Sequence, residues 1–423
     1  MTRIALLCSE PLRHRMAGIG IRYLEIARRL PALAGVEVVV VTPGEPEEVP
    51  SLPEGASVRP FRRGSLAADL ADCDAAVSQG QLANDLVLEC PQLPVAIDLY
   101  DPWLVENLHY VESLGLDPYR NDHATWVLQL SRGDFFLCSC EEQRLFYLGW
   151  LNALGRVHPH NLAQDPDLAE LIATVPFGVP PQIEAHRPLL PPSERKRLLF
   201  GGLYDWYDPF TLLEAGARLR REGRGDFEVL FIRNPNPGST PQRLLEAVEA
   251  FRRREGDWIQ LLDWTPAERR YDLLRDVDAL VAPHRPSLET RLSLRTRFLD
   301  ALAAGCPAVT SEGGAMSRML LSHGAGWVAP PGDSAALAGI LTEVLDDSAA
   351  VESRRSAGYR LLDSFRWETV LQPLVRFCRD PKRDDSKESF AFRPATQAPP
   401  DRLSFRIRRR LRRQLEALWP KRG

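Results

Sequence analysis

Short runs of apolar residues alternate along the chain with longer stretches in which apolar residues recur at helical spacing. Short apolar runs bounded by polar turns are typical of strands that are buried on both faces of a parallel sheet. They lie at residues 4–8, 36–41, 75–78, 94–98 and 134–139, and again at 196–200, 228–233, 258–262, 276–282 and 308–310. The pattern therefore predicts an α/β protein in which two doubly wound sheets follow one another.

The first apolar run leads into a glycine-containing loop, residues 9–20, and then into a helix predicted over residues 21–30. Gly18 and Gly20 fit a dinucleotide-binding fingerprint poorly, because Tyr23 stands where a third glycine or alanine is required. This disfavours a dinucleotide oxidoreductase. The loop is basic and opens a helix, an arrangement that can bind a phosphate, although a plain surface connection has the same pattern.

Two aspartates lie at the end of the run at residues 94–98. Asp98 closes the run, and Asp101 stands directly before Pro102. Open α/β sheets bind ligands at the carboxyl ends of their strands, so either aspartate is a candidate to bind a substrate hydroxyl or to act as a base. An aspartate followed by proline is also well suited to cap the start of a helix, and this alternative applies to Asp101.

The stretch from residue 284 to residue 314 carries the densest charge pattern in the second half. It holds four arginines and two carboxylates before a helix that ends at Gly305, and these are Arg285, Glu289, Arg291, Arg295, Arg297 and Asp300. A helix N-terminus flanked by arginines is a suitable site for a phosphate or diphosphate. Arg297 and Asp300 are three residues apart, so a salt-bridged surface helix is the alternative.

Overall composition is that of an ordinary soluble protein, with 44% hydrophobic and 26% charged residues among 423. The net charge of −4 argues against a nucleic-acid partner. Seven cysteines without a C-x-x-C pair predict reduced, buried thiols. The N-terminal apolar run is too short for a signal peptide, and no stretch has the length of a membrane span, so we expect a cytoplasmic protein.

The last 23 residues differ from the rest. Residues 401–423 hold nine basic groups and two acidic ones, a net charge of +7, so the remaining residues carry −11. Apolar side chains recur there at helical spacing, namely Ile407, Leu411, Leu415, Leu418 and Trp419. This predicts a basic amphipathic helix that binds an anionic membrane surface, with docking on the acidic body or on a partner as the alternative. Residues 379–400, polar and proline-containing, are expected to be a flexible linker.

Several segments together resemble the GT-B glycosyltransferases, particularly family 4. Residues 299–309, LDALAAGCPAV, are similar to the family's LEAMACGTPVV segment, and residues 324–333, GAGWVAPPGD, to its G-GLLVPPGD segment. Residues 98–107 and 201–209 resemble a bacterial branch linked to cell-surface polysaccharide and O-antigen assembly. The resemblance covers residues 1–370 and leaves the tail out.

The resemblance implies two Rossmann-like domains that face each other across a cleft. We expect an acceptor-side domain at residues 1–180, a nucleotide-sugar domain at 193–350, and C-terminal helices at 351–378 that cross back to the first domain. The implied activity is transfer of a sugar from a nucleotide-sugar donor to a glycan or lipid-linked acceptor. It would proceed with retention of configuration and without a required metal or other cofactor.

The resemblance also assigns roles to single residues. The family's pair of glutamates falls at Leu292 and Asp300, so Glu289 is expected to substitute for the first by binding ribose, while Asp300 binds a ribose or sugar hydroxyl. The family's basic pair falls near Gly202 and Asp208, neither of which is basic, so arginines of the 284–314 stretch are expected to hold the diphosphate.

Arg295 and Arg297 are therefore the expected catalytic groups, and Asp98 is expected to orient the acceptor. The remaining candidates for donor binding are Gly18, Gly20, Gly201, Gly202, Arg285, Arg291 and Gly313. Two alternatives on the same fold stay open at this point. One is a non-catalytic protein that binds a nucleotide sugar, and the other is a nucleotide-sugar epimerase.

Overall fold

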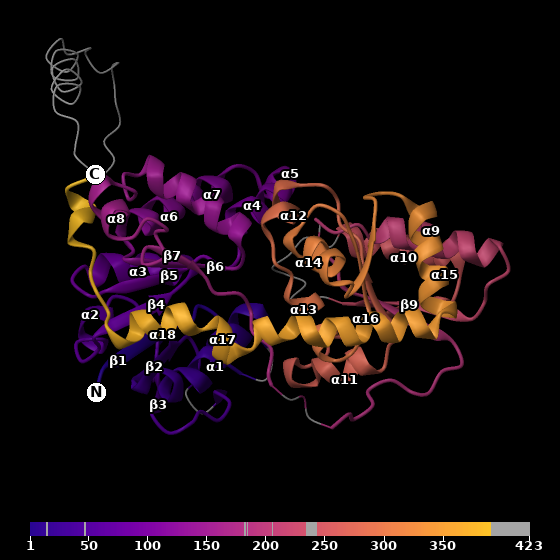
Figure 1. The fold of residues 1–423 in the computed structure, drawn as a ribbon, viewed down its shortest axis with the longest axis horizontal. Helices are drawn as coiled ribbons and strands as arrows, with labels where there is room; N and C mark the ends of the chain where they lie inside the picture. Colours follow the sequence, from indigo (N-terminus) through magenta and orange to yellow (C-terminus); the bar gives the residue numbers. More distant parts are fainter. Residues whose placement is uncertain are drawn as a thin grey trace, which may run out of the picture.

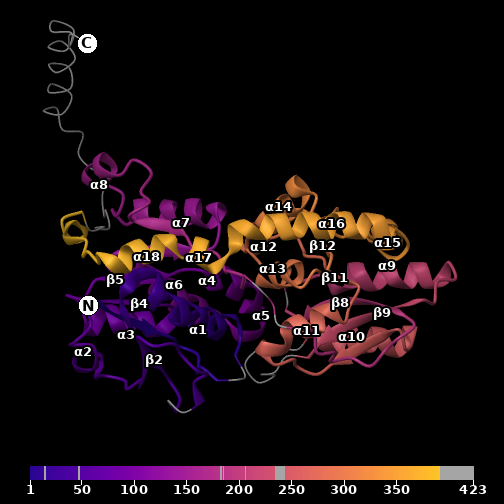
Figure 2. The same ribbon diagram turned by 60° about the horizontal axis from the view of Figure 1, so that its bottom comes forward.

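A computed structural model of the chain describes residues 1–13, 16–45, 48–181, 183, 185–204, 206–233 and 243–390. In these residues the chain forms two parallel sheets, one in each half, with helices on both faces (Figures 1 and 2). The doubly wound α/β arrangement predicted from the sequence is therefore confirmed.

The N-terminal half contains a seven-stranded parallel sheet of order β3-β2-β1-β4-β5-β6-β7. Its central strands are fully buried, which explains their continuous apolar runs. The strands are β1 (Arg3–Leu7), β2 (Glu37–Thr42), β3 (Ala56–Pro60), β4 (Ala75–Ser78), β5 (Val95–Asp98), β6 (Phe135–Cys138) and β7 (Ile172–Thr174). The helices are α1 (Gly18–Leu30), α2 (Leu66–Asp69), α3 (Gly80–Glu89), α4 (Trp103–Asn107), α5 (Val111–Leu114), α6 (Asp117–Arg132), α7 (Glu141–Ala153) and α8 (Pro159–Gln164).

The C-terminal half repeats this plan with a six-stranded parallel sheet of order β10-β9-β8-β11-β12-β13. Its strands are β8 (Lys196–Gly202), β9 (Phe227–Ile232), β10 (Ile259–Leu262), β11 (Ala279–Ala282), β12 (Ala308–Ser311) and β13 (Gly326–Ala329). Its helices are α9 (Pro209–Arg221), α10 (Arg243–Glu255), α11 (Arg270–Arg275), α12 (Leu288–Leu292), α13 (Thr296–Ala303), α14 (Ala315–His323), α15 (Ser334–Asp346) and α16 (Ser348–Leu361).

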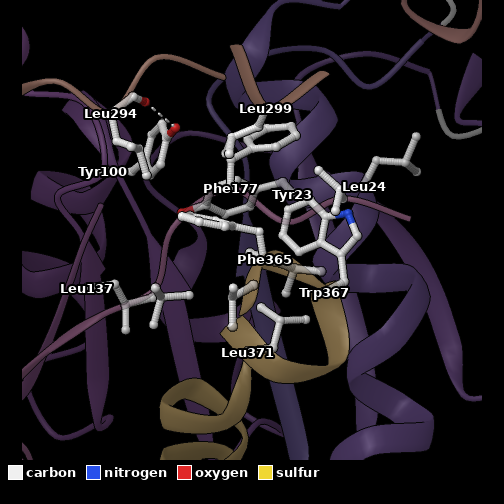
Figure 3. Close-up of a cluster of buried hydrophobic side chains, with 14 of the residues drawn as sticks. Tyr23, Leu24, Tyr100, Leu137, Phe177, Leu294, Leu299, Phe365, Trp367 and Leu371 are labelled. Carbon is white, nitrogen blue, oxygen red and sulfur yellow. Dashed lines mark hydrogen bonds between the residues drawn. The ribbon is translucent and has the colours of Figure 1, made fainter. Parts of the chain in front are cut away.

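After α16 the chain returns to the N-terminal half through α17 (Trp367–Val370) and α18 (Gln372–Arg379), as Figure 1 shows. Trp367 is 1% exposed and packs on Phe177, with 5.1 Å between ring centroids. A Cβ on Gly178 would lie 2.3 Å from the Trp367 side chain, so only glycine fits there. Figure 3 shows this cluster, in which Leu299 of α13 joins side chains of the N-terminal half.

The segment that follows α18 is anchored to the N-terminal half by buried charge pairs. Lys387 Nζ lies 2.8 Å from Asp134 Oδ1, and Arg156 donates to Asp384 over 2.8 Å. The expectation of a flexible linker from residue 379 is therefore wrong as far as residue 390. The polar composition of this segment is typical of a linker. Its order depends on Asp134 and Arg156, which lie far away in the sequence. Residues 391–400 and the amphipathic helix predicted over 401–423 lie outside the described residues.

Two further expectations concern the whole chain. All seven cysteines are buried and form no disulfide, as predicted. Among the described residues, no helix is both long and apolar enough to cross a membrane.

Candidate active site

A cavity of about 450 Å³ lies between the two halves, at the carboxyl ends of strands from both sheets. The N-terminal half contributes the start of α1 and the β5–α4 connection. The C-terminal half contributes the loop after β8 and the segment that joins α12 to α13. Most of the lining is apolar, which is typical of small-molecule sites. The charged residues that line the cavity are Asp101, Glu106, Arg270, Arg295, Arg297 and Asp300.

Arg295 is held by a carboxylate that is completely buried. Its Nη2 lies 2.6 Å from Glu289 Oε2, and Ser293 Oγ donates to Glu289 Oε1 over 2.7 Å. Burial alone would lower the pKa of Arg295, but the nearby Tyr207 and Glu289 raise it, so the guanidinium stays charged. Glu289 is 0% exposed and is not among the cavity residues, so it positions Arg295 instead of reaching a ribose.

Arg297, like Arg295, lies close to the ring of Tyr207. Its guanidinium is 4.2 Å from the centre of the Tyr207 ring, and that of Arg295 is 4.8 Å away, so the ring faces two cations. Arg297 Nη1 donates to the Phe200 carbonyl oxygen over 3.1 Å. This contact ties Arg297 to the end of β8.

The glycines after β8 leave room for this arginine. Gly201 has φ +92°, and a Cβ there would lie 3.2 Å from Arg297 Nη1. A side chain would therefore be strained and would crowd the guanidinium. Gly201 and Gly202 both line the cavity, as expected for residues near a bound donor.

Asp300 does not pair with Arg297, so the salt-bridged helix considered from the sequence is not found. Its partner is Arg270 of α11, whose Nε donates to Asp300 Oδ1 over 3.2 Å. Arg270 also donates to the Tyr271 hydroxyl over 2.9 Å and lines the cavity. Arg270 could not be predicted from the sequence, because nothing in the α11 segment marks it as close to residue 300.

The first glycine loop lies against the cavity through Gly18, whereas Gly20 is not among the lining residues. Glu10 accepts hydrogen bonds from the backbone N–H groups of Ala17 over 2.6 Å and Gly20 over 2.8 Å. The start of α1 is therefore capped by a carboxylate of the chain itself. A phosphate at Gly20 would have to displace Glu10 from the Gly20 N–H group. The backbone of Gly20 is therefore already engaged within the chain.

Asp98 also has a different environment from the one expected. It forms a buried ion pair with Arg22, whose Nε lies 2.7 Å from Asp98 Oδ2. The side chain of Arg22 is 1% exposed and that of Asp98 is 0% exposed. Arg22 donates further to the carbonyl oxygens of Val175 and Pro176. Asp98 is absent from the cavity lining, whereas Asp101 lines it. Of the two aspartates named from the sequence, Asp101 is the one placed to meet a substrate.

Tyr100 connects the two walls of the cavity. Its hydroxyl donates to the Leu294 carbonyl oxygen over 3.0 Å, the bond drawn as a dashed line in Figure 3. Its ring stacks on Arg22, with the guanidinium carbon 4.5 Å from the ring centre. Leu294 directly precedes Arg295 in the C-terminal half. This bond therefore fastens the backbone next to Arg295 to the N-terminal half.

The other candidates of the 284–314 stretch lie elsewhere. Arg285, Arg291 and Gly313 are exposed and do not line the cavity. His284 is buried, and burial together with Arg295 and Arg297 lowers its pKa well below the usual value, so the ring is neutral. In the described part of the chain, no group of three or more His, Cys, Asp or Glu residues is arranged to hold a metal ion.

Known proteins resemble the chain in sequence over part of its length and in fold over most of it. Residues 195–347 match the family described as glycosyl transferases group 1. Glycogen synthase from Mycobacterium tuberculosis is 35% identical over 105 residues, which are 25% of this chain and 25% of that protein. The match thus spans only about a quarter of the curated relative.

Solved structures resemble the chain over most of its length. Sucrose-phosphate synthase from Thermosynechococcus elongatus has a TM-score of 0.64 at 14% identity, covering 90% of this chain and 98% of that one. HepE from Anabaena, solved in complex with UDP-glucose, has a TM-score of 0.61 at 14% identity, covering 89% and 99%. The GT-B fold predicted from the sequence is therefore confirmed.

Proposed function

We propose that this protein is a glycosyltransferase that takes a sugar from a nucleotide-sugar donor bound in the cavity between its halves. The observation that carries the proposal is the pair Arg295 and Arg297, both of which lie close to the Tyr207 ring. Both line the cavity, and both belong to the segment that matches the group 1 transferases. Two fixed cations at one wall of an apolar cavity suit a diphosphate.

The arginines would act on the leaving group. As the bond between sugar and diphosphate breaks, negative charge grows on the departing phosphate oxygens. Arg295 and Arg297 stabilise that charge without reorganising, because Glu289 holds the first and the Phe200 carbonyl holds the second. Asp300 and Arg270 lie beside them and would bind donor hydroxyls or ribose. Gly201 and Gly202 let the donor approach the backbone.

The opposite wall would receive the acceptor. We propose a glycan or lipid-linked glycan acceptor, retention of configuration, no required metal, and a role in bacterial cell-surface polysaccharide or O-antigen assembly. The family resemblance of the sequence supports each of these. The tail at residues 401–423 would hold the protein on the inner face of the plasma membrane through its +7 charge.

A screen of sugar nucleotides tests the proposal. UDP-, GDP-, dTDP- and ADP-sugars are compared for their effect on the melting temperature, because a ligand that binds the native state raises it. UDP-glucose is the first probe, since HepE binds it. We expect one donor to raise the melting temperature and to release its nucleoside diphosphate when glycan acceptors are added.

Other outcomes would assign the protein differently. An isomerised sugar nucleotide formed without any acceptor would indicate an epimerase. Donor binding that never leads to transfer, with every acceptor class tried, would indicate a non-catalytic protein. If no sugar nucleotide changes the melting temperature, the proposed function is wrong.

A further inference from the structure

We propose that Asp101 and Glu106 select the acceptor, and that the acceptor end entering the cavity is a hydroxyl-bearing sugar without an anionic group. This inference rests on the proposed function, because it names the substrate class of the same cavity. It concerns the part of the cavity that the N-terminal half forms, where the sequence predicted Asp98 and Asp101 as candidates to bind a substrate hydroxyl.

Asp101 lies in the connection from β5 to α4, Glu106 lies within α4, and both line the cavity. Among the described residues, neither side chain has a hydrogen-bond or ion-pair partner. The other charged groups of the cavity do, since Arg295 bonds to Glu289, Arg270 to Asp300, and Arg297 to the Phe200 carbonyl. Asp101 and Glu106 are therefore the charged groups that a ligand would find available.

The helix-cap role considered for Asp101 does not account for its position. The residue that precedes the first turn of α4 is Pro102, and no side chain caps that helix. Keeping two partly buried carboxylates close together without partners costs folding free energy. Such an arrangement is understandable where the groups serve a substrate.

The surroundings of Asp101 and Glu106 raise the pKa of both carboxyl groups. Burial, and then the charge of Asp98, raise the pKa of Asp101 to about 6, while Arg22 opposes them. Burial, Asp101 and Glu289 raise the pKa of Glu106 well above its usual value, against the opposing effect of Arg295. Both carboxyl groups therefore hold a proton more readily than they would in water, and Asp101 is mostly ionised above about pH 6.

Two carboxyl groups that line the cavity without partners match a sugar's hydroxyls, because carboxyl oxygens accept the hydrogen bonds that hydroxyls donate. The titratable and charged groups around them are Asp98 on β5, Tyr100 after β5, Arg22 on α1, Tyr147 on α7, Glu289 on α12, Arg295 before α13 and Tyr204 after β8. The two arginines among these are already paired, with Asp98 and Glu289.

Two effects would disfavour productive binding of an anionic acceptor. A carboxylate or phosphate on the acceptor would face Asp101 at short range in a poorly solvated cavity. It would also be drawn to Arg295 and Arg297, where it would compete with the donor diphosphate. A neutral sugar end avoids both, so charge alone orients donor and acceptor on opposite walls.

The test uses saturation-transfer NMR on the full-length protein with UDP or GDP present. The probes are neutral methyl hexosides and the matching methyl uronates, which differ only in a carboxylate at carbon 6. They are compared on the wild type, on Asp101→Asn and Glu106→Gln, and on the control Asp117→Asn. Asp117 is an exposed residue of α6, with its side chain 93% accessible.

We expect neutral hexosides to bind the wild type and the control, and to bind Asp101→Asn and Glu106→Gln at least about fivefold more weakly. We expect the uronates not to bind the wild type. The proposal is overturned if uronates bind as well as hexosides, if both cavity variants match the control, or if no neutral hexoside binds. Melting curves verify that each variant folds. Failure of the proposed function shows separately, as the absence of any sugar-nucleotide effect on the melting temperature.

Discussion

Replacing Tyr100 by phenylalanine removes one hydroxyl and leaves the ring in place. That hydroxyl donates to the Leu294 carbonyl oxygen over 3.0 Å and is the bond that joins the N-terminal half to the backbone beside Arg295. The stacking of the ring on Arg22, 4.5 Å away, is kept in the variant. The change therefore removes this one hydrogen bond between the halves and keeps the others, such as that from Cys140 Sγ to the Leu292 carbonyl oxygen.

The expected magnitude follows from burial. Tyr100 is 7% exposed, so the Leu294 carbonyl loses its partner in a place that water scarcely reaches. Leaving one buried acceptor without a partner costs about 1–2 kcal/mol. If this loss destabilises only the arrangement in which Arg295 lines the cavity, the donor KM rises about 5- to 27-fold, because 1.4 kcal/mol corresponds to a factor of ten.

Tyr147→Phe is the matched control. Its hydroxyl donates to the Leu99 carbonyl oxygen over 3.2 Å, and the residue is 0% exposed, but both partners belong to the N-terminal half. We expect both variants to lose similar stability in urea denaturation, and only Tyr100→Phe to raise the donor KM in initial-rate measurements. Equal donor KM values in the two variants would refute the reasoning.

Three further predictions follow from the structure. Glu289→Gln should lower the free energy of unfolding by about 3 kcal/mol in urea titrations, because Arg295 is left without its buried carboxylate; a loss below about 0.5 kcal/mol would contradict the pairing. The Asp101 pKa of about 6 in the folded state exceeds its ordinary value of 3.8, so ionisation costs stability as the pH rises through about 6. Asp101→Asn should therefore be more stable than the wild type by about 1–3 kcal/mol at pH 8 and equally stable at pH 3, as measured by denaturation at both values. Removing residues 401–423 should lower binding to anionic vesicles at low salt in a sedimentation assay, and unchanged binding would count against the membrane role of the tail.

The fold was predictable because its central strands are buried on both faces. That burial requires continuous apolar runs, and such runs stand out in a sequence, as β1 and β2 show. The edge strand β3 (Ala56–Pro60) was missed for the same reason. Its residues are exposed or half-buried, so it carries no such run and contains Arg59. The anchored segment before residue 390 was missed because its order depends on charge pairs with Asp134 and Arg156.

The site was predictable where function needs unusual composition. Arg295 and Arg297 were predicted because several arginines lie close together at the start of a helix, and both line the cavity. Burial decided the rest, and burial depends on partners far along the chain. Asp98 is turned away from the cavity by Arg22, 76 residues earlier, and Arg270 is brought to Asp300 from 30 residues away. Neither pairing leaves a signal in the local sequence.

The side chain of Arg297 offers the most direct test that the cavity binds a nucleotide sugar through its arginines. Titration calorimetry would compare the wild type, Arg297→Gln and Arg291→Gln, using the sugar nucleotide that raises the melting temperature most. Arg291 is the matched control, since it belongs to the same stretch but is exposed and does not line the cavity. We predict that Arg297→Gln binds the donor at least about tenfold more weakly, while Arg291→Gln binds within about twofold of the wild type. Equal affinity of Arg297→Gln and the wild type would contradict the account.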